Sequence, residues 1–515
     1  MFTNEDLRLF QSKGIDIKVI EKQIENFKAG FPYIELAAPA VTGKGIKSFN
    51  DSEVEKLSAF YDKHSTDYEI LKFVPASGAA SRMFKDLFEF RETNSGKRGN
   101  KVEEDKLPKA IGQFFTNIQK FAFYDDLKAV MEKNDLSIKS LLEAKDYNTI
   151  IDYLLTDKGL GYASLPKGLL KFHRYDKESR MAMEEHLVEG ANYCRNSEDR
   201  VGIHFTVSPE HADRFIEEIN RIKDKYEELF DVVYELTFSM QKSSTDTLAV
   251  DINNKPFRDA DDTLIFRPGG HGALIENLND REGELIFIKN IDNIVPDSLK
   301  EETYRYKRVI GGYLLDLQQK VADAMEKLED GNPTDNEIKK ITQLAKDKLS
   351  IVPADDFDKW GRMEKIDFLY TKLNRPLRVC GMVKNEGRPS RRAHSRVKNA
   401  EGELSLQIVE SSQVNPNDEQ QQKILSQSTH FNPVDLICYV RDYNGELFDL
   451  REYVDPLTGF ISLKSKDGRE LKAQELPGLW NGAMADWITV FVEVPVITFN
   501  PVKTINDLLR KEHQA

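Results

Sequence analysis

The sequence has 515 residues, 40% of them hydrophobic, and a formal net charge of −14 at pH 7. This apolar content suffices for a large core in two or three domains, or in one domain with insertions. No apolar run of about 18 residues occurs, so no membrane helix is expected, and an acidic chain repels nucleic acid. Three scattered cysteines, Cys194, Cys380 and Cys438, indicate buried thiols rather than disulfides or a zinc site. With no pattern of a secretion signal, we expect a cytoplasmic protein.

Helical patterns dominate the first seventy residues. Thr3 can cap a helix whose third residue is Asp6. Residues 51–64 carry apolar side chains at helical spacing. We therefore expect an N-terminal helical segment over residues 1–68.

Strand and helix patterns then alternate along the chain. Apolar strands are expected at residues 70–74, 201–207, 232–238 and 285–289. A helix over 82–91 follows the first strand, and Ser208 and Pro209 can cap and begin a helix after the second. Alternation of this kind predicts a central, mostly parallel sheet with helices on both faces.

The last third of the chain has a different pattern. Residues 300–371 are helical and highly charged, as is typical of an insertion. Further strands are expected at residues 378–384, 404–410, 434–441 and 489–494. We therefore divide the chain into segments 1–68, 69–299, 300–371 and 372–515.

The first motif that suggests a chemical function is the small-residue turn over residues 76–81, between a strand and a helix. Backbone N–H groups in such a turn can hold phosphate oxygens. Arg82, at the start of the helix, would add a guanidinium group that can bind two phosphate oxygens at once. The turn lacks the spacing of a Walker loop, and small residues also suit an ordinary strand–helix junction.

Two further motifs centre on single side chains. Lys167 follows a proline among apolar residues and can direct one positive charge into a cleft, although a lone lysine is more often an ordinary surface residue. His271 lies in the glycine-rich loop 268–272, where a ligand can approach the backbone closely. Such a loop can equally be a plain turn.

The fourth motif is Asp292-Asn293, just after the buried strand 285–289. Ligands of open parallel sheets bind at the carboxyl ends of the strands. One carboxylate together with substrate phosphates commonly holds Mg²⁺. The same two residues could also simply begin a turn.

In this order, the four motifs resemble those of the sugar-nucleotide pyrophosphorylases, especially the UDP-sugar pyrophosphorylase branch. The family's G-G-x-G-T-R-[LM], P-K-x-L, P-x-G-H-G and D-N motifs match residues 77–83, 166–169, 268–272 and 292–293. Residues 408–413 resemble its V-V-E-Y-S-E sugar-binding strand, and residues 500–509 its L-P-V-K-x-x-x-D-L-L segment. The chain also resembles a bacterial domain-of-unknown-function family within this superfamily.

The resemblance implies a Rossmann-like GT-A nucleotidyltransferase fold, with a nucleotide-binding part at 69–299 and a sugar-binding part at 372–515. It implies transfer of a nucleotidyl group from a nucleoside triphosphate, expected to be UTP, to a sugar 1-phosphate, with Mg²⁺ as cofactor and pyrophosphate as product. The sugar and the oligomeric state stay open.

The resemblance also implies a role for each matching residue. The residues assigned to the reacting phosphates are Arg82, Lys167 and Lys503. Asp292 would bind Mg²⁺, while Asn293 and Glu410 would bind the sugar. The residues assigned to the nucleotide are Ser77, Gly78, Ala79, Ala80, Ser81, Gln241, Gly269, Gly270, His271 and Gly272.

Two departures from the family pattern keep alternatives open. Ser77 and Ala80 replace two glycines of the phosphate loop, and the methyl group of Ala80 lies where backbone normally approaches the triphosphate. This substitution favours a non-catalytic nucleotide-sugar-binding protein as an alternative. A GT-A glycosyltransferase is another alternative, although it would need an acidic metal-binding pair and would not need Lys167 and Lys503.

One segment is left out of the expected site. Residues 388–396 contain four arginines and no glycine. A single short basic run offers few contacts to nucleic acid, and like charges this close cannot be buried without partners. We expect an exposed, poorly packed loop here.

Overall fold

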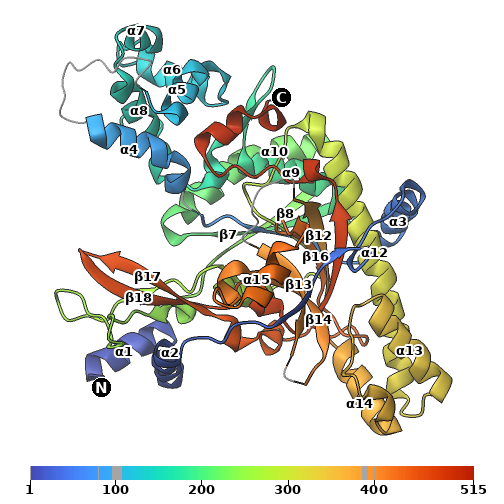
Figure 1. Ribbon diagram of the computed structural model, residues 1–515. Helices are drawn as coiled ribbons and strands as arrows, with labels where there is room; N and C mark the ends of the chain where they lie inside the picture. The colour runs from blue at the N-terminus through green and yellow to red at the C-terminus, as the bar shows by residue number, and fades with distance from the viewer. Residues whose placement is uncertain (1, 79, 95–106, 386–391, 400, 515) are drawn as a thin grey trace. The chain divides into compact units, whose positions relative to one another are not determined.

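A computed structural model describes residues 2–78, 80–94, 107–385, 392–399 and 401–514, with the backbone alone at 392–396 (Figure 1). The chain forms two compact units, each assembled from non-contiguous segments. Unit 1 comprises Met1–Leu71, Gln241–Ile288 and Arg308–Pro495. Unit 2 comprises Lys72–Met240, Lys289–Lys307 and Val496–Ala515. The four-segment division made from the sequence stays a prediction.

The main sheet of unit 1 is mixed. Its strands, in spatial order, are β2 (Val41–Thr42), β3 (Gly45–Lys47), β19 (Ile488–Val494), β12 (Leu377–Lys384), β16 (Asp435–Tyr439) and β11 (Leu285–Lys289). β12 runs parallel to β19 and antiparallel to β16 and to the short β15 (His430–Phe431). Every residue of β16 and all but the last of β12 is buried. These runs of buried residues, mostly apolar but including Arg378 and Asp435, are typical of central strands covered on both faces.

A smaller sheet in unit 1 corrects the prediction for residues 388–396. Residues Arg392–Lys398 form β13, which pairs antiparallel with β1 (Leu36–Pro39) and with β14 (Leu404–Glu410). Residues 388–391 lie outside the described residues. The prediction of a loop is therefore wrong for 392–396. β14 pairs with β13 along its whole length and β1 pairs with it at residues 395–397, and this backbone pairing, which charge does not predict, satisfies peptide groups of the strand.

The helices of unit 1 follow the sequence patterns closely. α1 (Asn4–Lys13) begins with the expected capping box between Thr3 and Asp6, and α3 (Asp51–His64) matches its predicted range. The charged region forms the 33-residue α12 (Asp297–Glu329), which begins in unit 2, followed by α13 (Asp335–Asp347) and α14 (Arg362–Leu373). The remaining helices of unit 1 are α2 (Ile17–Ala29), α11 (Leu274–Asn279) and α15 (Glu419–Ser426).

Unit 2 contains β4 (Ile70–Pro75, whose first two residues belong to unit 1), β7 (Arg200–Val207) and β8 (Val233–Met240), in that spatial order. β7 and β8 are parallel and are joined by α10 (Ala212–Phe230). α9 (Ala182–Tyr193) precedes β7. The predicted helix over 82–91 corresponds to the 3₁₀ turn Ala80–Phe84 and α4 (Lys85–Asn94). Helices that were not predicted follow it: α5 (Lys109–Thr116), α6 (Tyr124–Glu132), α7 (Ile138–Glu143) and α8 (Tyr147–Leu155).

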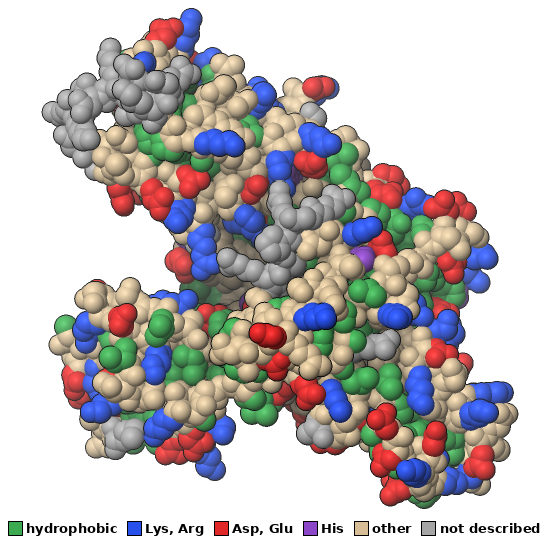
Figure 2. Space-filling model, viewed as in Figure 1, with side chains coloured by type: hydrophobic (Ala, Val, Ile, Leu, Met, Phe, Trp, Pro, Cys, Tyr) green, Lys and Arg blue, Asp and Glu red, His purple; other side chains and the backbone are tan. Residues whose placement is uncertain are grey.

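The architecture confirms a mixed α/β protein with a parallel-rich central sheet. The three cysteines are buried and unbonded. Across the described ranges, no helix combines the length and the apolar character needed to span a membrane. On the face shown in Figure 2, basic and acidic side chains are interspersed.

Candidate functional site

Two lysines converge on one buried carboxylate in unit 2. Nζ of Lys167 lies 2.8 Å from Oδ2 of Asp292, and Nζ of Lys503 lies 3.0 Å from the same oxygen. Asp292 is separated by 125 residues from Lys167 and by 211 residues from Lys503 in the sequence. The structure therefore brings together three of the side chains that were assigned to the phosphates and the metal.

Lys167 is held in place by close packing of its neighbours. Gly168 lies so close to Phe215 of α10 that a Cβ atom there would be 2.5 Å from the ring. The backbone N–H of Lys167 donates to the carbonyl of Gly78 (3.3 Å), and its Nζ donates to the carbonyl of Val502 (2.7 Å). Its side chain is 12% exposed. Lys167 is thus a fixed positive charge beside the small-residue turn.

Lys503 is positioned by its backbone rather than by packing. Oδ2 of Asp507 accepts hydrogen bonds from the N–H groups of Lys503 (2.8 Å) and Thr504 (2.7 Å). The side chain of Lys503 is 61% exposed. The backbone of Lys503 is therefore fixed, while its exposed side chain leaves the ammonium group free to move.

The segment after β19 pairs with the Asp292-Asn293 motif. The carbonyl of Asp292 accepts from the N–H of Val502 (3.1 Å). Oδ1 of Asn293 accepts from the N–H of Asn500 (2.9 Å), and Nδ2 of Asn293 donates to the carbonyl of Thr498 (3.4 Å). Asn293 is buried, and both the oxygen and the nitrogen of its side-chain amide are hydrogen-bonded to backbone groups. In this structure it positions the chain rather than presenting a free amide to a sugar.

The electrostatics of the cluster favour anions. Burial opposes ionisation of Asp292, but the ammonium groups of Lys167 and Lys503 outweigh it and hold the pKa of Asp292 below its usual value. Asp292 is therefore ionised, and with two lysines the cluster carries one net positive charge. A bound phosphate group could replace Asp292 as the partner of the two lysines without any movement of the backbone.

The small-residue turn borders Lys167, but not all of its N–H groups are available. Ser77, Gly78 and Ser81 are exposed. Ala80 is fully buried, and its N–H donates to the carbonyl of Leu165 at 3.1 Å. Its methyl group thus points into the core, and its N–H is already bonded. Ala79 lies outside the described residues.

Arg82 is not part of the lysine–aspartate cluster. It lies in the 3₁₀ turn Ala80–Phe84 that precedes α4, and its side chain is exposed. Within the described ranges no hydrogen bond or ion pair of Arg82 is seen. Its assignment to the triphosphate stays a prediction.

The glycine loop with His271 belongs to unit 1, where it packs tightly on the segment around Trp480. The rings of His271 and Trp480 stack at 4.2 Å, and Nδ1 of His271 accepts from the N–H of Leu479 (3.0 Å). A Cβ atom at Gly269 would lie 2.5 Å from the carbonyl oxygen of Thr245, and one at Gly272 would lie 2.1 Å from that of Pro477. These glycines serve close backbone packing.

The other assigned residues of unit 1 are less constrained. Gln241 is partly exposed, and its Nε2 donates to Oγ1 of Thr245 at 3.4 Å. Gly270 has a positive φ of 77°, and a Cβ atom there would lie 3.1 Å from Oε2 of Glu475. Glu410 ends β14, and its N–H donates to Oε1 of Gln413 (2.8 Å).

A Mg²⁺ site made of protein ligands alone does not fit the residues around Asp292. Across the described ranges, no three His, Cys, Asp or Glu side chains form a metal-binding group. Oδ2 of Asp292 already binds two ammonium groups. One carboxylate still fits a Mg²⁺ ion whose other ligands are phosphates and water.

Sequence reasoning missed three contributors to these sites. Asp507 fixes Lys503, and its spacing of four residues within the matched segment 500–509 was a usable signal. The carbonyl of Val502 as an acceptor for Lys167 carries no sequence signal. The stacking of Trp480 on His271 joins residues that are distant in sequence and follows from the fold alone.

Comparisons with known proteins place the chain in a family and give distant structural neighbours. A family model described as "Domain of unknown function (DUF4301)" matches residues 3–514. No curated protein matches the chain.

Three solved structures illustrate the likeness, which covers nearly the whole chain at low identity. The UDP-glucose pyrophosphorylase of Leishmania major is 12% identical over 98% of this chain and 77% of its own, with a TM-score of 0.45. The uridine diphosphate N-acetylglucosamine pyrophosphorylase of Trypanosoma brucei is 11% identical over 96% of this chain and 74% of its own, with a TM-score of 0.47. A UDP-glucose phosphorylase of Trypanosoma brucei is 13% identical over 99% of this chain and 80% of its own, with a TM-score of 0.43.

Proposed function

We propose that this chain, which belongs to the DUF4301 family, is a nucleotidyltransferase that joins a nucleoside triphosphate to a sugar 1-phosphate and releases pyrophosphate. The observation that carries the proposal is the convergence of Lys167 and Lys503 on Asp292, beside the turn that contains Gly78. A GT-A nucleotidyltransferase fold and UTP as the nucleotide are parts of the same proposal.

The proposed reaction needs positive charge more than proton transfer. An oxygen of the sugar phosphate attacks the α-phosphorus in line, a new P–O bond forms, and the bond to the β-phosphate oxygen breaks. The reactants are polyanions that repel each other, so the site must hold them together and neutralise their charge. Two lysines held by one carboxylate offer that net positive charge.

The two lysines have different roles in this scheme. Lys167 is nearly buried and bonded to backbone, so it would bind a phosphate whose position does not change. Lys503 is mostly exposed and can follow the reacting phosphates from its fixed backbone. Arg82, exposed beside the turn, would bind the outer phosphates of the triphosphate.

The remaining assignments complete the proposal. Asp292 would hold a Mg²⁺ ion that enters with the triphosphate, and that ion would supply further charge neutralisation. Gln241, Gly270 and His271 would recognise the base and ribose, and Glu410 would accept hydrogen bonds from sugar hydroxyls. Asn293 would act by positioning the backbone that carries Lys503.

A second candidate function rests on Ala80. Its N–H is bonded to the carbonyl of Leu165, so the turn offers one donor fewer to a phosphate. This favours a protein that binds a nucleotide sugar without catalysing its formation.

A screen of nucleoside triphosphates against sugar 1-phosphates, read out by pyrophosphate release, separates the two functions. The nucleotidyltransferase releases pyrophosphate only when both substrates are present. The non-catalytic protein is stabilised against heat by UTP or by a UDP-sugar, yet releases no pyrophosphate with any pair. That second pattern would reject the proposed activity.

A further inference from the structure

We propose that His513 is a positioning residue for Lys503, anchored through His173 to the buried carboxylate of Glu185 on α9. His513 and Lys503 both lie in the segment 496–514 of unit 2, here called the Lys503 segment. Glu185 and His173 belong to the same unit. The role of His513 rests on the proposed function in one respect, namely that Lys503 binds the reacting phosphates.

Two histidine rings connect Glu185 to the Lys503 segment. Nδ1 of His173 lies 2.8 Å from Oε1 of Glu185, and Nε2 of His173 lies 3.0 Å from Nδ1 of His513. Glu185 and His173 are 0% exposed, and His513 is 1% exposed. The three side chains therefore form one continuous, buried chain of polar contacts.

Arg510, at one end of this chain, fixes which ring nitrogens carry protons. Its Nη2 lies 3.3 Å from Nε2 of His513, and a guanidinium can only donate, so Nε2 accepts. Burial, followed by the charges of His173 and Arg510, lowers the pKa of His513 to about 3, so the ring is neutral and its proton is on Nδ1. Nδ1 then donates to His173, which in turn donates to Glu185. All of these hydrogen bonds run in one direction.

Glu185 is a rigid end point for the chain of contacts. Its Oε2 accepts from Nζ of Lys300 at 2.5 Å, and its Oε1 also accepts from the hydroxyl group of Tyr175 at 2.9 Å. Burial opposes ionisation of Glu185, but Lys300 and His173 outweigh it and lower the pKa of Glu185 to about 2. The carboxylate is therefore ionised, and both of its oxygens have donors.

Arg510 links His513 to the backbone around Lys503. The N–H of His513 donates to the carbonyl of Arg510 (2.9 Å), and Nη2 of Arg510 donates to the carbonyl of Pro501 (2.7 Å). Nε of Arg510 donates to the carbonyl of Asp507 (3.3 Å), whose carboxylate accepts from the N–H of Lys503. The Lys503 segment is thus folded around Arg510, and His513 attaches this folded segment to the rest of unit 2.

The buried chain of contacts serves location more than stability. Loss of hydration offsets much of what buried charged and polar groups gain from each other, and apolar side chains of similar volume often stabilise a core as well. A fully bonded polar network, in contrast, fixes distances and directions. Such fixing matters for Lys503, because its side chain is 61% exposed and has little packing of its own to hold it.

Apolar packing holds the rest of the Lys503 segment. Val502, Ile505 and Leu508 are at most 4% exposed. Nδ2 of Asn506 also donates to the carbonyl of Ala110 (2.8 Å). Loss of the His513 ring should therefore loosen the segment without releasing it, so a variant at this position remains folded and can be measured.

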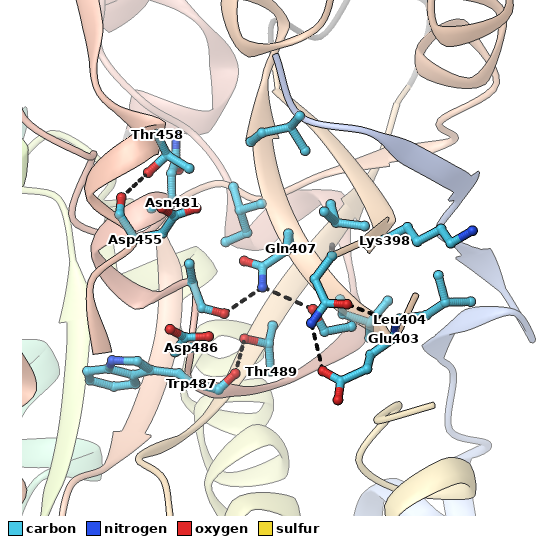
Figure 3. A pocket seen from close by; sticks show the side chains of 18 of the residues that line it. Lys398, Glu403, Leu404, Gln407, Asp455, Thr458, Asn481, Asp486, Trp487 and Thr489 are labelled. Atoms are coloured by element: carbon cyan, nitrogen blue, oxygen red, sulfur yellow. Dashed lines mark hydrogen bonds between the residues drawn. The ribbon is translucent and has the colours of Figure 1, made fainter. Parts of the chain in front are cut away.

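A cavity in unit 1 is not part of this arrangement (Figure 3). It has a volume of about 600 Å³, and Gln407, Asn481 and Thr489 are among the residues that line it. All of its described lining residues belong to unit 1, whereas the chain from Glu185 to Lys503 belongs to unit 2. The positioning of Lys503 is therefore argued from unit 2 alone.

Hydrogen–deuterium exchange of the full chain, read out by mass spectrometry, tests the positioning without any substrate. His513→Leu removes the donor and the acceptor of the ring, whereas His513→Gln keeps one of each. In His513→Leu, the peptide 500–507 should exchange at least about fivefold faster than in the wild type, because the segment opens locally more often. In His513→Gln, the rate should stay within about twofold of the wild type.

The matched control for exchange is His204→Leu. His204 is also a fully buried histidine of unit 2, and both of its ring nitrogens are bonded, to the hydroxyl groups of Thr237 (2.7 Å) and Ser239 (2.8 Å). This variant loses a comparable pair of hydrogen bonds outside the Lys503 segment. It should leave the exchange of peptide 500–507 unchanged.

Steady-state kinetics with UTP and a sugar 1-phosphate test the consequence for Lys503. Per folded molecule, His513→Leu should lower kcat at least about tenfold and change KM for UTP less than about threefold, because a misplaced contact is lost mainly in the transition state. His513→Gln should restore most of kcat. In the Lys503→Ala background, His513→Leu should change kcat less than about threefold, since residues that act through one another are not additive.

The two measurements fail in different ways. Equal exchange of peptide 500–507 in the wild type and in His513→Leu would overturn the proposal. An equal loss of kcat from His513→Leu with and without the Lys503 side chain would also overturn it, because a merely structural role acts in both backgrounds. A wild type that releases no pyrophosphate would reject the proposed function, and the exchange rates would then decide the positioning by themselves.

Discussion

Nζ of Lys503 lies 3.0 Å from Oδ2 of Asp292, although 61% of the Lys503 side chain is exposed to solvent. An exposed lysine that reaches a buried carboxylate gains little stability from the contact, because water screens the charge and the flexible chain loses entropy. The contact therefore adds little to the stability of the fold, and Lys503 is available for the proposed role in binding phosphate. Asp507, which accepts from the N–H of Lys503, keeps the residue there.

Replacement of Lys503 by alanine should lower turnover at least about 100-fold, because loss of one charge contact in the transition state costs on the order of 3 kcal/mol. The free energy of unfolding should change by less than about 0.5 kcal/mol, as for other exposed residues. Steady-state kinetics and urea denaturation measure the two quantities. Lys511→Ala, whose side chain is 92% exposed, is the control and should leave both unchanged. Near-normal turnover of Lys503→Ala would remove its assigned role.

Asp292→Asn should abolish metal-dependent activity. An amide is a far weaker Mg²⁺ ligand than a carboxylate, and the change leaves the ammonium groups of Lys167 and Lys503 without their shared counter-charge. Turnover is measured over a Mg²⁺ titration and in excess chelator. The metal assignment fails if the wild type stays active in chelator, or if the variant regains activity at saturating Mg²⁺.

Glu189→Gln should destabilise the protein by about 3–5 kcal/mol, because it leaves two buried ammonium groups without a counter-charge. Glu189 binds Lys72 at 2.9 Å and Lys289 at 2.6 Å, and all three side chains are at most 1% exposed. Urea denaturation measures the loss. The control, Glu25→Gln, breaks an ion pair whose side chains are 67% exposed and should change stability by less than about 0.5 kcal/mol. An equally small effect at Glu189 would contradict this prediction.

Acidification should destabilise the fold through His513. Burial, followed by the charges of His173 and Arg510, lowers the pKa of His513 from 6.5 to about 3. Its Nδ1 lies 3.0 Å from Nε2 of His173, whose Nδ1 lies 2.8 Å from Oε1 of Glu185. Between pH 6.5 and 3 the unfolded state binds a proton that the folded state does not, so stability falls as the pH falls.

The size of this effect follows from the linkage relation. Each pH unit below 6.5 costs about 1.4 kcal/mol, so His513 should contribute a loss of about 2 kcal/mol between pH 7.5 and pH 5. Urea denaturation at the two pH values, on the wild type and on His513→Gln, measures it. The variant should show the smaller pH dependence. Identical pH dependence in both proteins would show that His513 does not carry the effect.

The sequence predicted the parts of the fold that have strong local patterns. The strands around Val201–Val207 and Leu285–Lys289 and the helix after Pro209 appear within a few residues of their expected positions, because apolar periodicity and caps are local signals. β13 was missed because its strand character comes from pairing with neighbours on both sides, which charge alone does not reveal.

The site shows the same division between local and long-range information. Lys167, Asp292 and Lys503 were found as motifs, and the structure places their side chains in contact. The bonded N–H of Ala80 could not be foreseen, since its acceptor is 85 positions away and depends on how Leu165 packs.

The most direct test of the account is the product balance of the wild-type protein with UTP, a sugar 1-phosphate and Mg²⁺. Phosphorus NMR follows nucleotide sugar and pyrophosphate in the same sample, without coupling enzymes. The account predicts that the two products appear in equal amounts, and at least about 100-fold more slowly with Lys503→Ala. Binding of UTP with no pyrophosphate from any of the tested sugar phosphates and nucleotides would contradict it.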